Sequence, residues 1–321
     1  MSRKLLVHTR FFAEKHIAAI DAAARARGFE MVFTDDADQA VAAAGDAEIL
    51  FCAEPRLPKA APELKWLCLT SAGADAYLKP GAILNPDALL TNSSGAYGVT
   101  IAEHVVMVTL ELMRRQREYN DVVARRDWVR TLPVRSIRNC RCTLLGTGDI
   151  GREAAIRLKA FGPKRVVGVN RSGRDPGEMF DETVSIDRLD EVLPETDLLV
   201  MSLPGTPETR GLMDGRRIAL MPADAFLVNV GRGNALDQRA LEAQLRAGHL
   251  LGAALDVFEK EPIEKDDTLW ECPRLLITPH VAGNMTLPYT VDRIVELFLE
   301  DFDNYCAGRP LQRLVDRKKG Y

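Results

Sequence analysis

The sequence contains no long apolar run and no excess of basic residues. Its 321 residues include 42 Lys and Arg against 46 Asp and Glu, so the formal net charge is only −4. Binding the phosphates of nucleic acid requires a concentrated basic surface, and spanning a bilayer requires about 20 consecutive apolar residues. We therefore expect neither a nucleic-acid partner nor a membrane partner.

Cysteine is also scarce, with six residues in the whole chain. Most adjoin apolar runs, as Cys52 and Cys68 do, where a free thiol behaves as a small hydrophobe. One residue separates Cys140 from Cys142, whereas paired zinc ligands are usually about two to four residues apart. The first apolar run, 5–7, is too short for a secretory signal. We expect a cytoplasmic protein without a metal site.

Short apolar runs alternate with helical stretches, a pattern typical of parallel sheets covered by helices on both faces. The length exceeds that of one typical domain, so two tandem α/β units are predicted. The expected strands of the first unit are 4–9, 30–34, 47–52, 66–71 and 89–92. Those of the second are 142–146, 165–170, 197–203, 225–230, 250–257 and 274–279. Helices are expected at 13–27, 99–119 and 287–305.

A glycine motif, Gly146-Thr-Gly148-Asp-Ile-Gly151, follows an apolar strand and begins a helix. In a dinucleotide-binding turn, the first glycine permits the tight turn, the second lets the backbone approach a pyrophosphate, and the third lets helix and strand pack closely. The amino terminus of the helix then faces the phosphates with free N–H groups. We expect 146–151 to bind a dinucleotide, with Asp149 and Ile150 in contact.

The next strand ends in Asn170-Arg171-Ser172, where a site that prefers NAD usually places Asp or Glu. Arg171 can pair with the 2′-phosphate of NADP, and Asn170 and Ser172 can donate hydrogen bonds to it. The sequence therefore favours NADP(H) over NAD(H). In the alternative interpretation Arg171 stacks on adenine, and both cofactors are usable.

Three later segments place reactive side chains after predicted strands, where ligands bind in open α/β sheets. Arg232 lies between two glycines and suits a carboxylate. Glu261 precedes a proline in an acidic loop that begins at Asp256, and His280 follows an apolar strand. Reduction of a keto acid needs a cation for the carboxylate and carbonyl, an acid that protonates the carbonyl oxygen, and a carboxylate that orients this acid. Arg232, His280 and Glu261 provide these groups.

The motifs GTGDIG, VNVGRG, ALDVFEKEP and ITPHVAG occur in this order, and the chain resembles the D-isomer-specific 2-hydroxyacid dehydrogenase family over nearly its whole length. The resemblance implies a catalytic set of Arg232, Glu261 and His280. It implies that Asp256 touches the nicotinamide and that Leu203, Pro204 and Val230 line it. It also implies a loop that grips the substrate carboxylate through backbone N–H groups, formed by Ser71, Ala72, Gly73 and Ala74.

The resemblance further implies two Rossmann-like, doubly wound parallel-sheet domains with the active site in the cleft between them. Residues 1–97 plus 288–321 would form a flavodoxin-like substrate domain, and 98–287 the dinucleotide-binding domain. Members commonly dimerise through the segment that corresponds to 118–138, which contains Trp128, so a homodimer is expected. Whether Tyr97, Trp128 or Tyr289 reaches the active site stays open.

At 170–172 the chain lacks the acidic residue of members that prefer NAD, and in this it is similar to glyoxylate and hydroxypyruvate reductases that use NADPH. The expected substrate is therefore a small 2-keto or D-2-hydroxy acid. Two alternatives stay open. One is an NAD-linked dehydrogenase of another D-2-hydroxy acid such as phosphoglycerate. The other is a nucleotide-sensing scaffold without catalysis, which would carry long disordered extensions or a degraded catalytic set.

Overall fold

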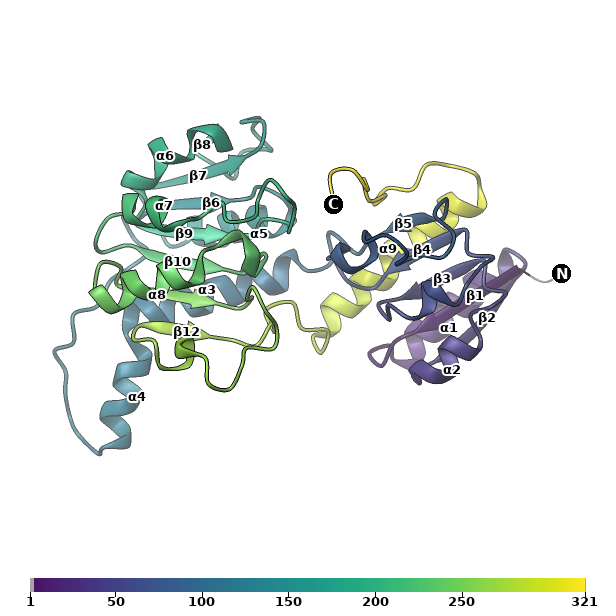
Figure 1. Ribbon diagram of the computed structural model, residues 1–321, viewed down its shortest axis with the longest axis horizontal. Helices are drawn as coiled ribbons and strands as arrows, with labels where there is room; N and C mark the ends of the chain where they lie inside the picture. Colours follow the sequence, from purple (N-terminus) through teal and green to yellow (C-terminus); the bar gives the residue numbers. More distant parts are fainter. Residues whose placement is uncertain (1–2, 321) are drawn as a thin grey trace. The chain divides into compact units, whose positions relative to one another are not determined.

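The computed structural model describes residues 3–320, which divide into two compact units (Figure 1). The first unit comprises Met1–Tyr97 and Met285–Tyr321, and the second comprises Gly98–Asn284. The chain thus returns to the first unit at 284/285, three residues before the 287/288 boundary inferred from the sequence. The assignment of the units to substrate and cofactor stays a prediction.

The first unit contains a parallel sheet with strand order β2-β1-β3-β4-β5. Its strands are β1 (Arg3–His8), β2 (Phe29–Thr34), β3 (Ile49–Cys52), β4 (Trp66–Leu69) and β5 (Leu89–Thr91). Its helices are α1 (Glu14–Ala26), α2 (Ala37–Ala42) and α9 (Pro288–Cys306), with short 3-10 helices at Leu57–Lys59 and Asp75–Tyr77. This strand order is that of flavodoxin-like folds.

Both faces of this sheet are covered because successive strand residues point to opposite sides. On one face Leu6 and Leu50 pack with Ala40 of α2. On the other, the Phe51 ring of β3 stacks on Phe298 of α9, with ring centroids 4.1 Å apart. The C-terminal helix therefore completes the core of the unit that the N-terminal strands begin.

The second unit contains a longer parallel sheet with strand order β12-β11-β10-β9-β6-β7-β8. Its strands are β6 (Arg141–Leu145), β7 (Arg165–Asn170), β8 (Glu182–Ser185), β9 (Leu198–Met201), β10 (Phe226–Asn229), β11 (Gly252–Leu255) and β12 (Leu275–Ile277). The chain begins at β6, runs outward to β8, and crosses back to β9 on the other side of β6. This reversal between β6 and β9 is the position where doubly wound sheets bind ligands, beyond the carboxyl ends of the strands.

Helices cover both faces of this sheet (Figure 1). They are α3 (Gly98–Arg114), α4 (Gln116–Ala124), α5 (Asp149–Lys159), α6 (Leu189–Val192), α7 (Gly215–Leu220) and α8 (Gln238–Ala247), with 3-10 helices at Ile186–Arg188, Leu193–Glu195, Gly233–Ala235 and Thr268–Glu271. Every residue of β9, β10 and β11 is buried, as expected for strands covered on both faces. No helix in the described part of the chain is long and apolar enough to cross a membrane.

Two elements differ from the sequence prediction. The helix expected over 99–119 breaks at Arg115, whose left-handed backbone (φ 56°) separates α3 from α4. Strand β8 was not predicted, because its sequence Glu-Thr-Val-Ser has no apolar run. It is an edge strand that pairs only with β7, and an edge strand needs fewer apolar side chains than a central one.

Candidate active site

The glycine motif forms a tight turn between β6 and α5. Gly146 has φ 109°, and its N–H donates to the carbonyl oxygen of Val169 over 2.9 Å. A Cβ at Gly151 would lie 2.0 Å from the carbonyl oxygen of Gly146, so only glycine fits there. A Cβ at Gly148, the N-cap of α5, would meet no described atom within 4 Å. The amino terminus of α5 therefore faces open space, as a phosphate-binding turn requires.

Within this turn, the Asp149 side chain lies against the amino terminus of α3. Its carboxylate atoms would be 2.6 Å from a Cβ at Gly98, the first residue of α3. A carboxylate in this position is stabilised by the positive end of the helix dipole. The Asp149 side chain thus serves the contact between two helices, and the expected cofactor contact of this residue stays a prediction. Ile150, the next residue, is half-buried.

Asn170, at the end of β7, organises the loop that follows it. Its Nδ2 donates to Thr147 Oγ1 over 3.0 Å and to the Arg174 carbonyl over 2.9 Å. Its Oδ1 accepts from the backbone N–H groups of Ser172 (3.1 Å) and Gly173 (2.7 Å). The amide that we expected to donate to a phosphate is therefore already engaged. The Asn170 side chain thus shapes the loop, and its contact with a cofactor stays a prediction.

The same loop exposes two arginines, Arg171 and Arg174. Only Arg171 was predicted as a site residue. Arg174 is a second candidate, which its spacing of three residues from Arg171 across Gly173 could have indicated, because a tight turn brings such residues near one another. The Arg174 N–H donates to Ser172 Oγ over 3.3 Å, which fixes the turn further.

The predicted nicotinamide side lies where β9 and β10 end. Leu203 and Val230 are both buried, and the Val230 N–H donates to the Met201 carbonyl over 3.0 Å. A Cβ at Gly231 would lie 2.6 Å from Leu203 N, so the two loops approach each other more closely than a side chain would allow. Pro204 is half-buried beside them. The loops form an apolar wall at the carboxyl edge of the sheet.

Arg232 follows directly, half-buried in a turn closed by Asn229. Asn229 Oδ1 accepts from the Gly231 N–H, and its Nδ2 donates to the Arg232 carbonyl, both over 3.1 Å. A Cβ at Gly233 would lie 1.9 Å from the Phe258 carbonyl carbon. The turn that carries Arg232 therefore touches the loop that carries Glu261.

His280 and Glu261 form a direct pair, with His280 Nδ1 2.7 Å from Glu261 Oε2. The other carboxylate oxygen, Oε1, accepts from the Phe258 N–H over 2.8 Å, so the backbone fixes the carboxylate. The His280 side chain is 51% exposed and that of Glu261 36%. With Nδ1 occupied by the carboxylate, Nε2 is the ring nitrogen left to exchange a proton with a ligand.

Asp256 lies directly after β11 and is 3% exposed. Its carboxylate accepts hydrogen bonds from Thr278 Oγ1 (2.6 Å) and from the N–H groups of Val281 (2.9 Å) and Ala282 (3.0 Å). These three donors belong to the segment around His280. The structure thus shows the Asp256 side chain bonded to the segment that carries His280, and the nicotinamide contact implied by the resemblance stays a prediction.

In the first unit, the segment from Ser71 to Ala74 follows β4. Its carbonyl groups are engaged: Ser71 Oγ donates to the Gly73 carbonyl over 2.9 Å, and Asn92 Nδ2 donates to the Ala72 carbonyl over 2.8 Å. Tyr97, a side chain left open by the sequence, is buried and donates to the Thr70 carbonyl over 2.6 Å. These hydrogen bonds to carbonyl oxygens fix the conformation of the loop 71–74.

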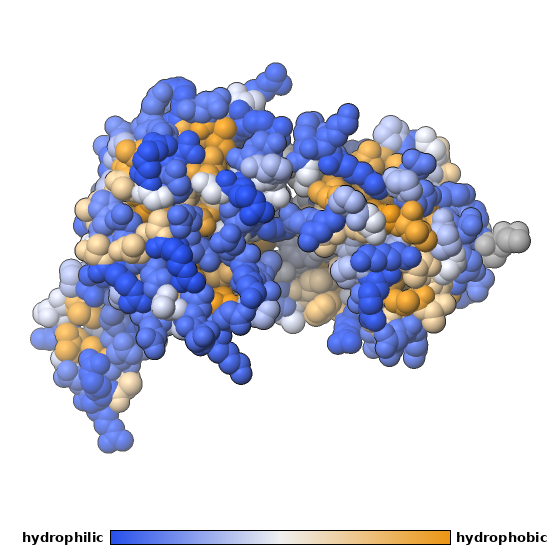
Figure 2. All heavy atoms as spheres, viewed as in Figure 1, coloured by the Kyte–Doolittle hydropathy of each residue, from blue (hydrophilic) through white to orange (hydrophobic). Residues whose placement is uncertain are grey.

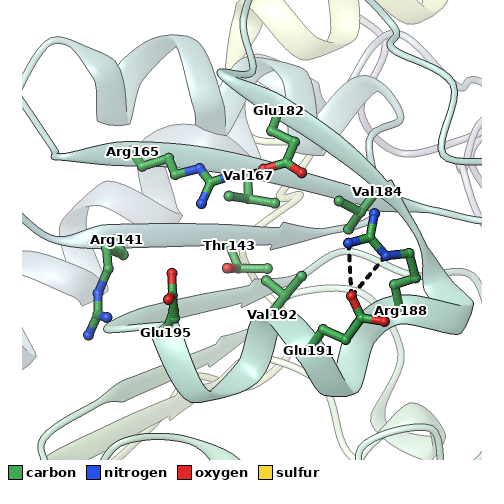
Figure 3. Close-up of a pocket in the computed structure, with 10 residues that line it drawn as sticks. All are labelled: Arg141, Thr143, Arg165, Val167, Glu182, Val184, Arg188, Glu191, Val192 and Glu195. Atoms are coloured by element: carbon green, nitrogen blue, oxygen red, sulfur yellow. Dashed lines mark hydrogen bonds and ion pairs between the residues drawn. The ribbon is translucent and has the colours of Figure 1, made fainter.

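A charged cavity of about 210 Å³ lies at the opposite edge of the second sheet (Figure 3). Arg141 and Arg165, which line it, are the first residues of β6 and β7, whereas the candidate site lies at the carboxyl ends of the strands. Arg188 and Glu191 pair within it, with Nε and Oε2 2.9 Å apart. The cavity is thus separate from the candidate site formed by Arg232, Glu261 and His280.

A doubly wound sheet with this glycine turn defines a dinucleotide-binding protein. Residues 106–282 match the family model described as D-isomer specific 2-hydroxyacid dehydrogenase, NAD binding domain. Glyoxylate/hydroxypyruvate reductase A of Yersinia enterocolitica is 30% identical over 277 residues, which cover 81% of this chain and 82% of the relative.

Comparison with solved structures finds similar proteins of the same family. A D-isomer specific 2-hydroxyacid dehydrogenase family protein from Aeromonas salmonicida is 33% identical with a TM-score of 0.87, covering 99% of this chain and 100% of the other. An NADPH-dependent glyoxylate/hydroxypyruvate reductase from Sinorhizobium meliloti, in complex with NADP and sulfate, is 29% identical with a TM-score of 0.84 and the same coverage.

The chain belongs to the D-isomer-specific 2-hydroxyacid dehydrogenase family. The resemblance inferred from the four motifs is confirmed, as are the two parallel-sheet α/β domains and the class of nicotinamide-dependent oxidoreductase.

Proposed function

We propose that the protein reduces a small 2-keto acid to the corresponding D-2-hydroxy acid, with NADPH as the preferred cofactor and NADH as a second one. The pair of His280 and Glu261 carries the proposal, because a histidine held by a carboxylate supplies and recovers a proton near neutral pH. Glyoxylate and hydroxypyruvate are the proposed substrates, supported by the relatives from Yersinia and Sinorhizobium.

The residues of the second unit fit a dinucleotide. The open space at Gly148 and the close packing at Gly151 suit a pyrophosphate at the amino terminus of α5. Arg171 and Arg174 provide positive charge for a 2′-phosphate, and no acidic side chain ends β7 to repel it. When bound, the reduced nicotinamide supplies the hydride for the reaction.

The chain supplies charge and protons for the same step. Arg232 binds the substrate carboxylate and polarises the carbonyl with its planar guanidinium. His280 donates a proton from Nε2 to the carbonyl oxygen as the carbonyl carbon accepts hydride. Glu261 accepts the Nδ1–H bond, which fixes the ring orientation and stabilises the imidazolium before transfer. The neutral ring then regains its proton from solvent, to which it is open.

The backbone N–H groups of 71–74 are the proposed second contact for the substrate carboxylate. Hydrogen bonds hold the carbonyl groups of Ala72 and Gly73, which supports a loop whose N–H groups serve a ligand. Small side chains at 72–74 suit a small acid.

The test is absorbance-monitored oxidation of NADPH and NADH with a panel of 2-keto acids. The panel runs from glyoxylate and hydroxypyruvate to pyruvate, phosphohydroxypyruvate and branched acids. Turnover of the two smallest hydroxy- or aldehyde-bearing acids with NADPH is the expected result. Preference for NADH and a larger acid would favour an NAD-linked dehydrogenase. Tight cofactor binding without any turnover would favour the nucleotide-sensing scaffold.

We also propose a homodimer formed through 118–138. The cytoplasmic location stays a prediction from the sequence. The support is exposed apolar surface: Val123 is 71% exposed and Trp128 86%. Figure 1 shows α4 projecting from its unit, and Figure 2 shows apolar patches on it. Light scattering coupled to size exclusion should give twice the chain mass, and Trp128→Glu should weaken the dimer. A monomer at micromolar concentration would contradict the proposal.

A further inference from the structure

His280 has a backbone conformation that a residue with a side chain adopts at a cost. Its φ is 54°, in the left-handed region, where strain is on the order of 1 kcal/mol or more. Such a conformation persists only where surrounding contacts determine it. Its N–H donates to the carbonyl oxygens of Asp256 (2.9 Å) and Thr278 (3.0 Å). The contacts that hold this turn therefore place the catalytic ring.

The Asp256 carboxylate is the main anchor of the turn. The two N–H groups after His280, those of Val281 and Ala282, donate to its two different oxygens over 2.9 and 3.0 Å. Successive backbone N–H groups around an anion form a compact binding arrangement, and it requires αR–αL or related backbone angles. The carboxylate thus stabilises the conformation that His280 adopts.

The carboxylate is itself held from behind by Thr278 and His104. Thr278 Oγ1 lies 2.6 Å from Asp256 Oδ1, and His104 Nε2 lies 3.3 Å from Thr278 Oγ1. A hydroxyl has one proton, and the carboxylate can only accept, so Thr278 donates to Asp256 and accepts from His104. His104, on α3, therefore carries its proton on Nε2.

His104 sits in surroundings that favour the neutral ring. Its side chain is 10% exposed, with Asp256 Oδ1 4.0 Å from Nε2. Burial lowers the pKa of His104, although the negative charges of Asp256 and Glu111 oppose this effect. A neutral ring near pH 7 acts as a hydrogen-bond donor and takes no part in proton transfer with the substrate.

We propose that His104 and Thr278 are positioning residues for the reduction: through Asp256 they hold the left-handed turn that presents His280 to Glu261 and the substrate. This inference rests on the proposed function, because it assigns a role toward its catalytic histidine. It also separates two roles for Asp256. A carboxylate that contacts nicotinamide would control cofactor affinity, whereas one that holds the turn controls turnover.

Two matched pairs of variants test the chain of contacts. Thr278→Val removes the hydroxyl and keeps the branched shape, and Thr278→Ser restores the hydroxyl. His104→Leu removes the ring donor, and His104→Gln restores an N–H at similar reach. Thr278→Val and His104→Leu should lower kcat about tenfold while the Kd for NADPH stays within about twofold. The two restoring variants should regain turnover to within about threefold of wild type.

The same substitutions are then made with His280→Ala. If Thr278 acts through His280, Thr278→Val should lower the residual turnover of His280→Ala by less than about twofold. A purely structural role would lower both enzymes equally. Amide hydrogen exchange at Val281 and Ala282 provides a readout without activity, and it should accelerate about tenfold in Thr278→Val.

The outcomes separate the two proposals. A wild-type protein that reduces no 2-keto acid contradicts the proposed function, while the exchange measurement still decides whether Thr278 holds the turn. Unchanged exchange at Val281 and Ala282 overturns the positioning role. Equal loss of kcat in the wild-type and His280→Ala backgrounds, or a large rise in the NADPH Kd with kcat unchanged, overturns it as well.

Discussion

Glu261→Gln tests the proposed catalytic pair of Glu261 and His280 directly, since it keeps the shape of the side chain and removes its charge. In the structure Oε1 accepts from the Phe258 N–H over 2.8 Å, and Oε2 lies 2.7 Å from His280 Nδ1. A glutamine keeps its carbonyl oxygen on the Phe258 N–H, because the amide nitrogen cannot accept that bond. Its NH₂ group then faces His280 Nδ1. The ring must accept at Nδ1, which is the protonation pattern of neutral imidazole.

The size of the effect follows from two contributions. A hydrogen bond to a charged group contributes about 1.5–3 kcal/mol, and the lower end applies because both side chains are open to solvent. At 1.36 kcal/mol per factor of ten, this loss alone lowers kcat about tenfold. The reversed hydrogen bond disfavours the imidazolium that must donate the proton, and general acid catalysis contributes at least about a hundredfold. We expect kcat to fall on the order of a hundredfold.

The assay is steady-state reduction of the preferred 2-keto acid, with the NADPH Kd measured by fluorescence. The Kd should stay within about twofold, because the pair acts in the transition state. Glu259→Gln is the matched control: it removes an exposed carboxylate two residues away in the same loop, and it should keep wild-type turnover. Full activity of Glu261→Gln, or equal losses in both variants, would refute the reasoning.

Three further predictions concern the cofactor turn and the core of the first unit. Arg171→Ala should raise the KM for NADPH about tenfold and leave that for NADH unchanged; equal losses in steady-state kinetics would remove Arg171 from the 2′-phosphate site. Gly151→Ala should lower Tm, because its Cβ would lie 2.0 Å from a carbonyl oxygen. Gly148→Ala, with open space around its Cβ, should keep Tm and weaken NADPH binding. Calorimetry measures Tm and titration measures NADPH binding, and the reverse pattern would contradict the assignment of the turn to the cofactor. A hydrogen bond from Arg3 lowers the pKa of buried Glu48, so this pair stabilises the fold above pH about 4.5 and the stabilisation disappears as pH falls. Glu48→Gln should reduce the free energy of unfolding at pH 7 and change it little near pH 3. Equal effects at both pH values would exclude this linkage.

The location of the proposed catalytic residues was predictable because parallel strands end at one edge of a sheet. Arg232, Glu261 and His280 were each identified as reactive side chains after an apolar run, and a parallel sheet brings such positions together. The structure places the ends of β10, β11 and β12 as neighbours. Apolar runs located the buried strands to within a few residues, whereas β8, a polar edge strand, gave no such signal.

Side-chain partners were not predictable in the same way. Asn170 was expected at the cofactor from its position after a strand, and Asp256 from the family resemblance; both contacts stay predictions. The structure shows that both side chains bond to loops of their own chain, which the sequence did not indicate. Position in the sequence indicates which edge a residue occupies. Which donor meets which acceptor depends on backbone angles, such as the left-handed φ of His280, and no local residue pattern specified that angle.

His280 is more than half exposed, yet its ring must keep one orientation for proton transfer. An exposed side chain gains conformational entropy by leaving such an orientation, so a surface imidazole needs restraint from the protein. Both restraints come from one loop after β11: Asp256 binds the N–H groups beside the His280 backbone, and Glu261 binds the ring itself. Backbone and ring are thus fixed at separate points, which leaves Nε2 the group able to reach a ligand. A displacement of that single loop would release both contacts together. Substitutions that move the loop should therefore lower turnover more than a substitution that removes only the Asp256 contact or only the Glu261 contact.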